Sequence, residues 1–397
     1  MSRRDTHTHA PRQLWLAVVS LAVSSFSLVT AEFLPVGLLG PIAQDLGVSI
    51  GTAGWLVAMP ALLAALAAPS LTIFAARRDR RKILLALTAL LAASMLLSIF
   101  AASWTILLAA RMVLGIAVGG FWAIGASLPG RMMPPQAVGR ATSIVYMGSS
   151  VGIVLGVPIG TLIGQHYGWR VAFALSSATA ILAFASQWWA LPHIKGNASL
   201  RARDLVGIVR QPATIIALFV TMLAVGTQFG TYTFIEPFLT GVTGVSASIV
   251  AAALLAYGAA GLIGSMLGGF GADRSLAMTL NLVLLTTMAA LAGLYLFGTS
   301  ALASLTLILA WGVAFGALPL CLQLWSMRLA HPQIEAGSAL FVGFLQISIA
   351  AGSAAGGMSV DRLGLHNTMG IGASIFVLAL ILGVLARNTV PPAQPNH

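Results

Sequence analysis

The chain has 397 residues, of which 58% are hydrophobic and only 7% are charged. Soluble domains use roughly 45–50% apolar and about 25% charged residues, so this composition excludes a soluble enzyme and predicts a polytopic membrane protein. The net charge of +11 does not point to a nucleic-acid partner, because the basic residues line the ends of apolar runs and form no patch.

Twelve apolar runs follow one another along the chain. Each is long enough to cross a bilayer as a helix, which takes about 20 residues, so the sequence predicts an all-α membrane protein with twelve transmembrane helices. The runs cover residues 14–40, 53–75, 83–102, 105–128, 142–164, 171–191, 212–238, 247–270, 277–297, 302–327, 336–358 and 367–387.

The loops between these runs differ sharply in charge. Basic residues gather in the loops of one face, whereas the opposite face receives only Arg170 and Arg362. The positive-inside rule therefore predicts that both termini are cytoplasmic. The predicted divisions are a tail at 1–13, a six-helix bundle at 14–192, a cytoplasmic linker at 193–211, a second six-helix bundle at 212–387 and a tail at 388–397.

An internal repeat supports this division into two bundles. Several features recur at an offset of 196 residues: Pro41 with Pro237, Ala76 and Arg78 with Ala272 and Arg274, and Gly156, Gly160 and Gly168 with Gly352, Gly356 and Gly364. Six spans make an even number, so the two halves have parallel topology and are related by a pseudo-symmetry axis along the membrane normal. The same offset aligns Glu32 with Gln228, and Gly40 with Glu236.

Two acids, Glu32 and Glu236, fall inside apolar runs, and no histidine does. Glu32 is predicted to lie roughly 12 Å deep, where an ionised carboxylate costs about 2.5–3.5 kcal/mol and must be paired, hydrated or protonated. We interpret Glu32 as the proton carrier; a neutral acid making a structural hydrogen bond is the alternative. Glu236 is expected near the outer rim, in a capping role or as a second coupling acid.

Arg111 is the one basic residue within a predicted span, and a buried guanidinium keeps its charge. Its predicted depth, about 10 Å from the outer face, matches that of Glu32. We therefore expect a Glu32–Arg111 pair that protonation breaks. The alternative is that Arg111 caps backbone carbonyls or faces the cavity alone.

The loop between the second and third runs reads ARRDRRK, from Ala76 to Lys82. It resembles the loop motif of the major facilitator superfamily, which implies that Arg78, Arg81 and Lys82 help to hold the bundles together on the cytoplasmic side. Arg77 stands at the usual Asp position and Ile73 at the usual Gly. The second copy, with Gly269, Asp273 and Arg274, is nearer to the motif.

Two further runs extend this resemblance. Arg111 is followed four residues on by Gly115, as in a motif of the fourth span of that family, which adds to the case for coupling. The fifth span carries Gly148, Gly152, Gly156, Pro158, Gly160 and Gly164. This stripe permits close helix contact and resembles the antiporter motif of the superfamily, which implies exchange; simple packing is the alternative.

Within the superfamily, several runs are similar to those of the bacterial twelve-span drug and metabolite proton antiporters. AEFLPVGLLGPIAQDLGVS, GGFWAIGASL, GQHYGWRVAF and EAGSALFVGFLQ resemble the members that export purine ribonucleosides, whereas TYTFIEPFL resembles those that export sugars. The resemblance implies proton-coupled export of a small polar or amphiphilic molecule. A purine ribonucleoside is the first choice, then a sugar or glycoside, then a drug such as chloramphenicol.

Polar and aromatic residues in the central spans are the candidates for holding this cargo, since such pockets use a few placed hydrogen bonds and stacking faces. They are Thr30, Trp122, Tyr146, Thr227, Gln228, Tyr232, Gln323 and Gln346, with Trp325 as a residue typical of an interface belt. Each has the alternative role of a contact between helices.

Neither a channel nor an intramembrane enzyme fits these residues. A channel would need rings of like charge or a backbone filter, and an enzyme would need a nucleophile and base or a metal cluster. We expect no metal and no cofactor. The predicted partners are a small-molecule substrate, protons and the bilayer, and the expected oligomeric state is a monomer.

Overall fold

The computed structural model describes residues 12–75, 78–194, 211–329 and 334–385, and every element within them is helical. The predicted tails, most of the predicted linker, and Ala76 and Arg77 lie outside the described residues. The first half of the chain contributes α1 (Arg12–Phe33), η1 (Leu34–Gly37), α2 (Leu39–Leu46), α3 (Ile50–Ala53), α4 (Trp55–Ala75), α5 (Arg80–Ile99), α6 (Trp104–Gly120), η2 (Phe121–Gly125), α7 (Pro129–Met132), α8 (Pro135–Val151), η3 (Gly152–Gly156), α9 (Val157–Tyr167) and α10 (Trp169–Ala190). The second half contributes α12 (Pro212–Tyr232), α13 (Ile235–Gly241), α14 (Ala247–Phe297), α15 (Ala301–Leu329), α16 (Ile334–Leu363) and α17 (Leu365–Leu385).

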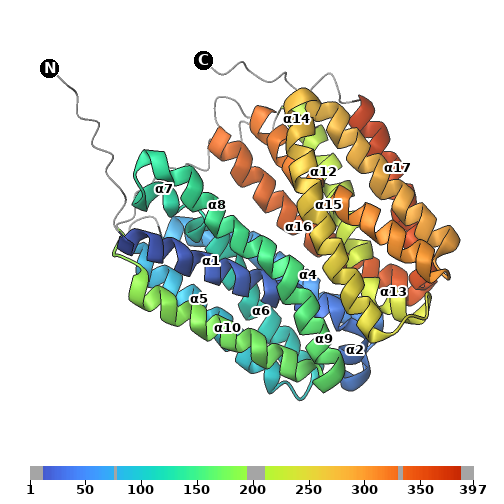
Figure 1. The fold of residues 1–397 in the computed structure, drawn as a ribbon, viewed down its shortest axis with the longest axis horizontal. Coiled ribbons are helices and arrows are strands. Elements are labelled where there is room, and N and C mark those ends of the chain that lie inside the picture. Colours follow the sequence, from blue (N-terminus) through green and yellow to red (C-terminus); the bar gives the residue numbers. More distant parts are fainter. Residues whose placement is uncertain (1–11, 76–77, 195–210, 330–333, 386–397) are drawn as a thin grey trace.

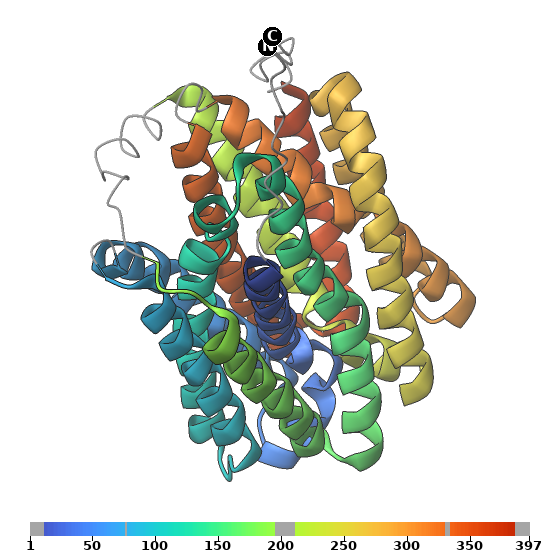
Figure 2. The same cartoon turned by 60° about the vertical axis from the view of Figure 1, so that its left-hand side comes forward.

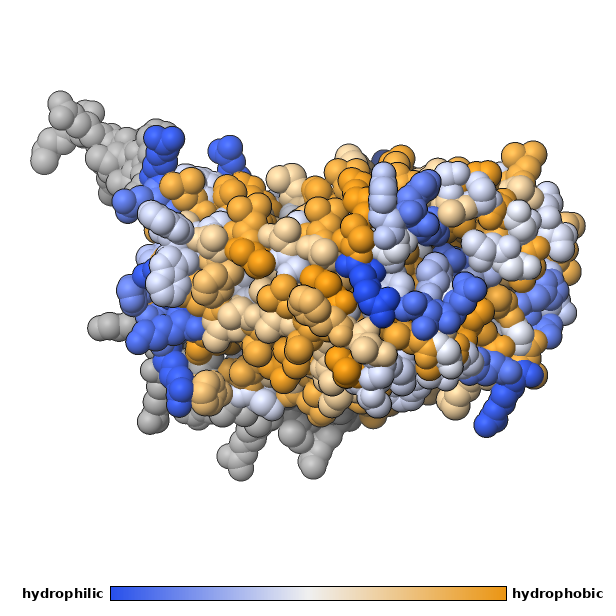
Figure 3. Space-filling model, turned by 90° about the horizontal axis from the view of Figure 1, so that it is seen from below, coloured by the Kyte–Doolittle hydropathy of each residue, from blue (hydrophilic) through white to orange (hydrophobic). Residues whose placement is uncertain are grey.

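These helices form two bundles, each with its own buried apolar core. Figure 1 shows the blue to green helices of the first half beside the yellow to red helices of the second. In the first bundle α1 packs on α8 and α10, and in Figure 2 the dark blue α1 lies between green helices. Hydrophobic side chains cover a broad area of the surface in Figure 3, with hydrophilic residues toward two opposite sides and in a patch right of the middle. This is the surface expected of a protein whose sides face lipid.

Eleven helices of the described chain are long and apolar enough to cross a membrane. One of them, α14, has 51 residues, or about 76 Å, more than twice the bilayer core. Its backbone leaves helical geometry at Ser275. Just before α14, the Thr243 hydroxyl donates to the carbonyl oxygen of Gly298, just after it, at 2.8 Å. Both ends of α14 therefore lie together, so it crosses twice and contains the two predicted spans 247–270 and 277–297.

The glycine stripe of the fifth span packs along the first. A Cβ placed on Gly148, Gly152, Gly156 and Gly160 would meet in turn Ala22, Phe26, Thr30 and Leu34, which are also four residues apart. The second bundle repeats this contact 196 residues later, because Gly352 lies against Gly226 and Gly356 against Gly230. The predicted close helix contact is therefore present in both halves.

Two contacts between the bundles join residues that are themselves 196 positions apart. The Phe33 and Phe229 rings stack with centroids 5.6 Å apart, and the Gly40 backbone N–H donates to Glu236 Oε2 at 2.8 Å. Residues related by a twofold axis touch each other only close to that axis, so these two contacts mark its course through the molecule.

We call the end that carries Arg12, Arg80, Arg131, Arg274 and Arg328 the near end. The opposite, far end carries Asp45, Arg170, Asp361 and Arg362. At the far end Asp45 forms an ion pair with Arg170 at 2.7 Å. The hydrogen bonds from Arg170 and Trp169 lower the pKa of the Asp45 carboxyl, and both partners belong to the first bundle.

Candidate transport site

Arg111 in α6 is fully buried, and its guanidinium donates to three backbone carbonyls. Nε reaches Leu56 O at 2.8 Å, Nη1 reaches Ala31 O at 2.7 Å and Nη2 reaches Glu32 O at 2.6 Å. In a helix these carbonyls would accept from the residue four positions on. For Ala31 and Leu56 that residue is Pro35 or Pro60, which has no N–H. Arg111 thus replaces two donors that proline removed.

The predicted Glu32–Arg111 ion pair is not formed in this structure. Among the described residues the pairs of opposite charge within 4.0 Å are Arg170–Asp45 and His193–Asp79, and the Glu32 carboxylate belongs to neither. The two residues nevertheless lie beside each other, because Arg111 binds the backbone of Glu32 itself. The guanidinium is held by carbonyls, which was the alternative interpretation.

The Glu32 carboxyl, only 4% exposed, instead lies close to the side chain of Gln346 of α16. Gln346 belongs to the second bundle and is also buried. The predicted proton carrier and one predicted cavity residue therefore meet across the boundary between the bundles, next to the stacked Phe33 and Phe229 rings.

Glu236 lies in the first turn of α13 and is 3% exposed. Its carboxylate accepts a hydrogen bond from Gly40 N in α2 of the first bundle. The sequence places Glu236 near the outer rim as a possible cap; in the structure it caps a backbone N–H of the other bundle rather than its own helix.

Gln228, the counterpart of Glu32 in the repeat, is fully buried inside the second bundle. It donates from Nε2 to the Tyr257 hydroxyl at 2.8 Å, and its Oε1 accepts from Trp311 Nε1 at 2.7 Å. Tyr232 stacks on Tyr257 with ring centroids 4.6 Å apart. Gln228 and Tyr232 are among the predicted cavity residues, whereas Tyr257 and Trp311 are not. The signal for these two is that a Tyr hydroxyl or a Trp indole N–H buried in an apolar span needs a polar partner.

The other predicted cavity residues are spread over both bundles. The rings of Trp122 and Tyr146 lie 5.5 Å apart in the first bundle, and Tyr146 is 46% exposed. Thr30 and Thr227 are buried, and Gln323 is partly buried in α15. The structure brings Glu32 close to Gln346. It also brings Gln228 to Tyr257, on which Tyr232 stacks. These described contacts do not join the whole set of predicted cavity residues into one cluster.

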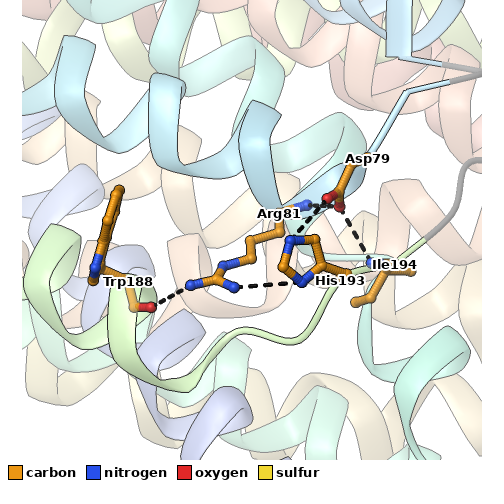
Figure 4. Close-up of polar contacts among 5 residues, drawn as sticks. All are labelled: Asp79, Arg81, Trp188, His193 and Ile194. Carbon is orange, nitrogen blue, oxygen red and sulfur yellow. Dashed lines mark hydrogen bonds and ion pairs between the residues drawn. The ribbon is translucent and has the colours of Figure 1, made fainter.

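The loop at the near end binds the end of its own bundle (Figure 4). Asp79 caps α5 by accepting from Arg81 N at 3.0 Å, and it also accepts from Ile194 N at 3.2 Å. His193 Nε2 lies 3.7 Å from Asp79, and Arg81 donates to Trp188 O at 2.6 Å. These polar contacts of the described loop residues all stay with α10 and the residues that follow it.

The remaining motif residues are placed more simply. Arg78 lies over the Phe74 ring at 3.8 Å, and Lys82 is exposed in the first turn of α5. Asp273 and Arg274 immediately precede the break at Ser275, beside Ala272, whose carbonyl oxygen accepts from Arg328 at 3.4 Å. Pro158 lies in the first turn of α9, directly after the π-helical turn η3.

A family model and several known proteins match most of this chain. The model of the Major Facilitator Superfamily matches residues 21–344. The chain is 34% identical to the "transcription regulatory protein OpdE" of Pseudomonas aeruginosa over 98% of both chains. It is 32% identical to the purine ribonucleoside efflux pump NepI of Shigella sonnei over 94% of both chains.

Solved structures share the fold at low sequence identity. A bacterial homologue of the human lysosomal transporter Spinster, inward-facing and occupied, matches with a TM-score of 0.79 and 16% identity over 98% of this chain and all of that one. The human organic anion transporter MFSD10 matches with a TM-score of 0.68 and 16% identity, over 94% of this chain and all of that one.

Proposed function

Because the chain belongs to the Major Facilitator Superfamily, we propose that it is a proton-coupled antiporter that exports a small polar or amphiphilic molecule from the cytoplasm. The family and the efflux pumps among its relatives make it a membrane transporter of small molecules rather than an enzyme. The proposal includes the coupling to protons, the direction of exchange and the cargo. It also includes the cytoplasmic termini, the bacterial inner membrane and the monomeric state.

One juxtaposition carries the proposal: the buried Glu32 carboxyl of the first bundle lies close to the buried Gln346 side chain of the second. Alternating access requires the bundles to rotate against each other, and this rotation changes what surrounds a side chain at their boundary. An ionised carboxylate there depends on polar partners far more strongly than a neutral carboxyl does. Proton uptake by Glu32 is therefore linked to the arrangement of the bundles.

Arg111 contributes by fixing the backbone of this acid. Its bonds to Ala31 O and Glu32 O hold the end of α1, and its bond to Leu56 O fixes α4 relative to α1. The positive charge beside Glu32 is thus immobile. Release of the proton leaves a carboxylate close to a fixed cation, which favours the ionised form in one arrangement of the bundles.

A purine ribonucleoside is the preferred cargo. Relatives named for purine ribonucleoside efflux support it, as do the stacked Phe33 and Phe229 rings beside Glu32, since flat rings favour flat partners. A sugar or glycoside is the second candidate, because of the resemblance around Glu236, and a drug such as chloramphenicol is the third.

Proteoliposomes that contain the purified protein test this function. A proton gradient should drive saturable uptake of inosine or adenosine against its concentration gradient. Glu32→Gln should abolish this proton-driven accumulation and leave binding intact, measured as the rise in melting temperature on adding nucleoside, because a ligand that binds the folded state stabilises it.

Asp45→Asn is the control, since it neutralises an acid that bonds only within the first bundle, and Glu236→Gln tests the second coupling acid while keeping an oxygen to accept from Gly40. Unaltered coupling in Glu32→Gln would exclude Glu32 as the carrier. Flux that never saturates would indicate a channel, and a melting temperature that rises only with sugars or chloramphenicol would replace the preferred cargo.

A further inference from the structure

Two carboxylates of the second bundle hold backbone N–H groups of the first bundle at the far end. Asp361 near the end of α16 accepts from Gly51 N at 2.9 Å through Oδ1, and from the Ser49 hydroxyl at 2.7 Å through Oδ2. Glu236 accepts from Gly40 N at 2.8 Å. Each of these hydrogen bonds joins the second bundle to the first, so the two acids tie the bundles together here.

The backbones around Asp361 are in direct contact. A Cβ added at Gly51 would collide with the Gly357 carbonyl and with the Asp361 carboxylate, and a Cβ at Gly357 would collide with the Gly51 carbonyl. Behind this contact lies a buried apolar cluster of Leu39, Ala43 and Ala53 from the first bundle with Phe234 and Val360 from the second. The far end is therefore sealed by carboxylates and apolar packing.

At the near end, the carboxylate of Asp79 bonds within the first bundle. Asp79 receives hydrogen bonds from Arg81 N and Ile194 N and faces His193, and all three belong to α5 or to the segment after α10 (Figure 4). Asp361 and Glu236 thus join the two bundles at the far end, whereas Asp79 acts inside its own bundle.

We propose that Asp361 is a positioning residue for transport: its hydrogen bonds to Ser49 and Gly51 hold the far end closed and set the ratio of the two access states. For this end to open, both bonds must break, while the Asp45–Arg170 pair at the same end remains intact because it lies within one bundle. The inference rests on the alternating access of the proposed function, but it requires neither a particular cargo nor protons.

The distance between the bundles at the far end tests this role. Spin labels on Gln44→Cys in α2 and Asn367→Cys in α17, both exposed positions, report it by double electron–electron resonance, with Cys321→Ala removing the buried native cysteine. Asp361→Asn should raise the ratio of long to short distances by about tenfold, the order expected for losing a charge-assisted hydrogen bond. Asp45→Asn, which neutralises an acid of the same type and end, should leave the distribution unchanged.

An unchanged distribution in Asp361→Asn, or an equal shift in Asp45→Asn, would overturn the proposal. If Asp361→Asn fails to fold, Ser49→Ala removes one of the two bonds and should give a smaller shift in the same direction; no shift there also counts against it. Because these distances are measured without cargo, failure of nucleoside transport would remove the proposed substrate and leave this result standing.

Discussion

At the scale of single residues, Arg111 shows how an intramembrane charge can serve the backbone. Pro35 and Pro60 each leave a carbonyl without its helical donor, and Arg111 donates to both. A buried carbonyl without a partner costs about 1–3 kcal/mol. The Arg111 guanidinium therefore has a structural role in the fold that does not depend on any role in proton coupling.

Arg111→Leu should lower stability by at least about 3 kcal/mol, because three buried carbonyls lose their donor. The measurement is the melting temperature of the purified protein together with its denaturant midpoint. Pro60→Ala provides a matched test, since it restores an N–H that can bond Leu56 O within α4. The loss caused by Arg111→Leu should then be smaller in the Pro60→Ala background, and equal losses in both backgrounds would refute this assignment.

Part of this arrangement was readable from the residues alone. Arg111 and Glu32 stand out because charge is rare in apolar runs, and Pro35 and Pro60 signal carbonyls in need of donors. The hydrogen-bond partner of each charged group could not be predicted from the sequence. A guanidinium can bond either a carboxylate or carbonyls, and the rotation of the helices decides which of them it meets. Gln346 could not be matched with Glu32 for the same reason.

At the scale of elements, the glycine stripe of α8, η3 and α9 sets how closely the fifth span approaches α1. A Cβ at Gly148 would collide with the Ala22 carbonyl, and backbone cannot move aside as a flexible side chain can. Gly148→Ala should therefore push the helices apart and destabilise the protein by about 1–3 kcal/mol, measured by thermal melting.

Gly139→Ala is the control on the same helix, where a Cβ would meet nothing within 4 Å. Since alanine favours helix by about 1 kcal/mol over glycine, this variant should be neutral or slightly more stable. Equal destabilisation by both substitutions would contradict a specific contact at Gly148.

Most elements follow from apolar length, and two of the departures have a clear physical cause. The predicted spans 247–270 and 277–297 form one element that turns at Ser275, because the loop between them is short enough for helical hydrogen bonding to continue on both sides. The fifth span starts at Pro135 rather than at residue 142, because polar residues such as Arg140 extend a helix beyond the apolar stretch.

At the scale of the whole molecule, the distribution of basic residues predicts which side each end faces. In the Cys321→Ala background, a membrane-impermeant maleimide added to intact cells should label Asn367→Cys at the far end. It should label Arg140→Cys at the near end only after the membrane is broken, since both positions are exposed in the structure. The reverse pattern would place the termini outside.

The repeat offset predicted two bundles, and it aligned Gly40 with Glu236, which the structure brings into contact. It could not predict the contact of Asp361 with Ser49, because the aligned residues, Gln165 and Val245, carry no matching pair. Contacts that differ between the halves depend on how the bundles are tilted, and tilt leaves no periodic pattern in a sequence.

The pairing of Gly40 with Glu236 has a consequence for how such a molecule can arise. In a dimer of two identical halves, a residue on the dyad meets its own copy, so glutamate there would confront glutamate and glycine would face empty space. Joining the halves in one polypeptide lifts this restriction. Each dyad position can then hold two unlike residues, a donor opposite an acceptor, which separate identical chains cannot achieve.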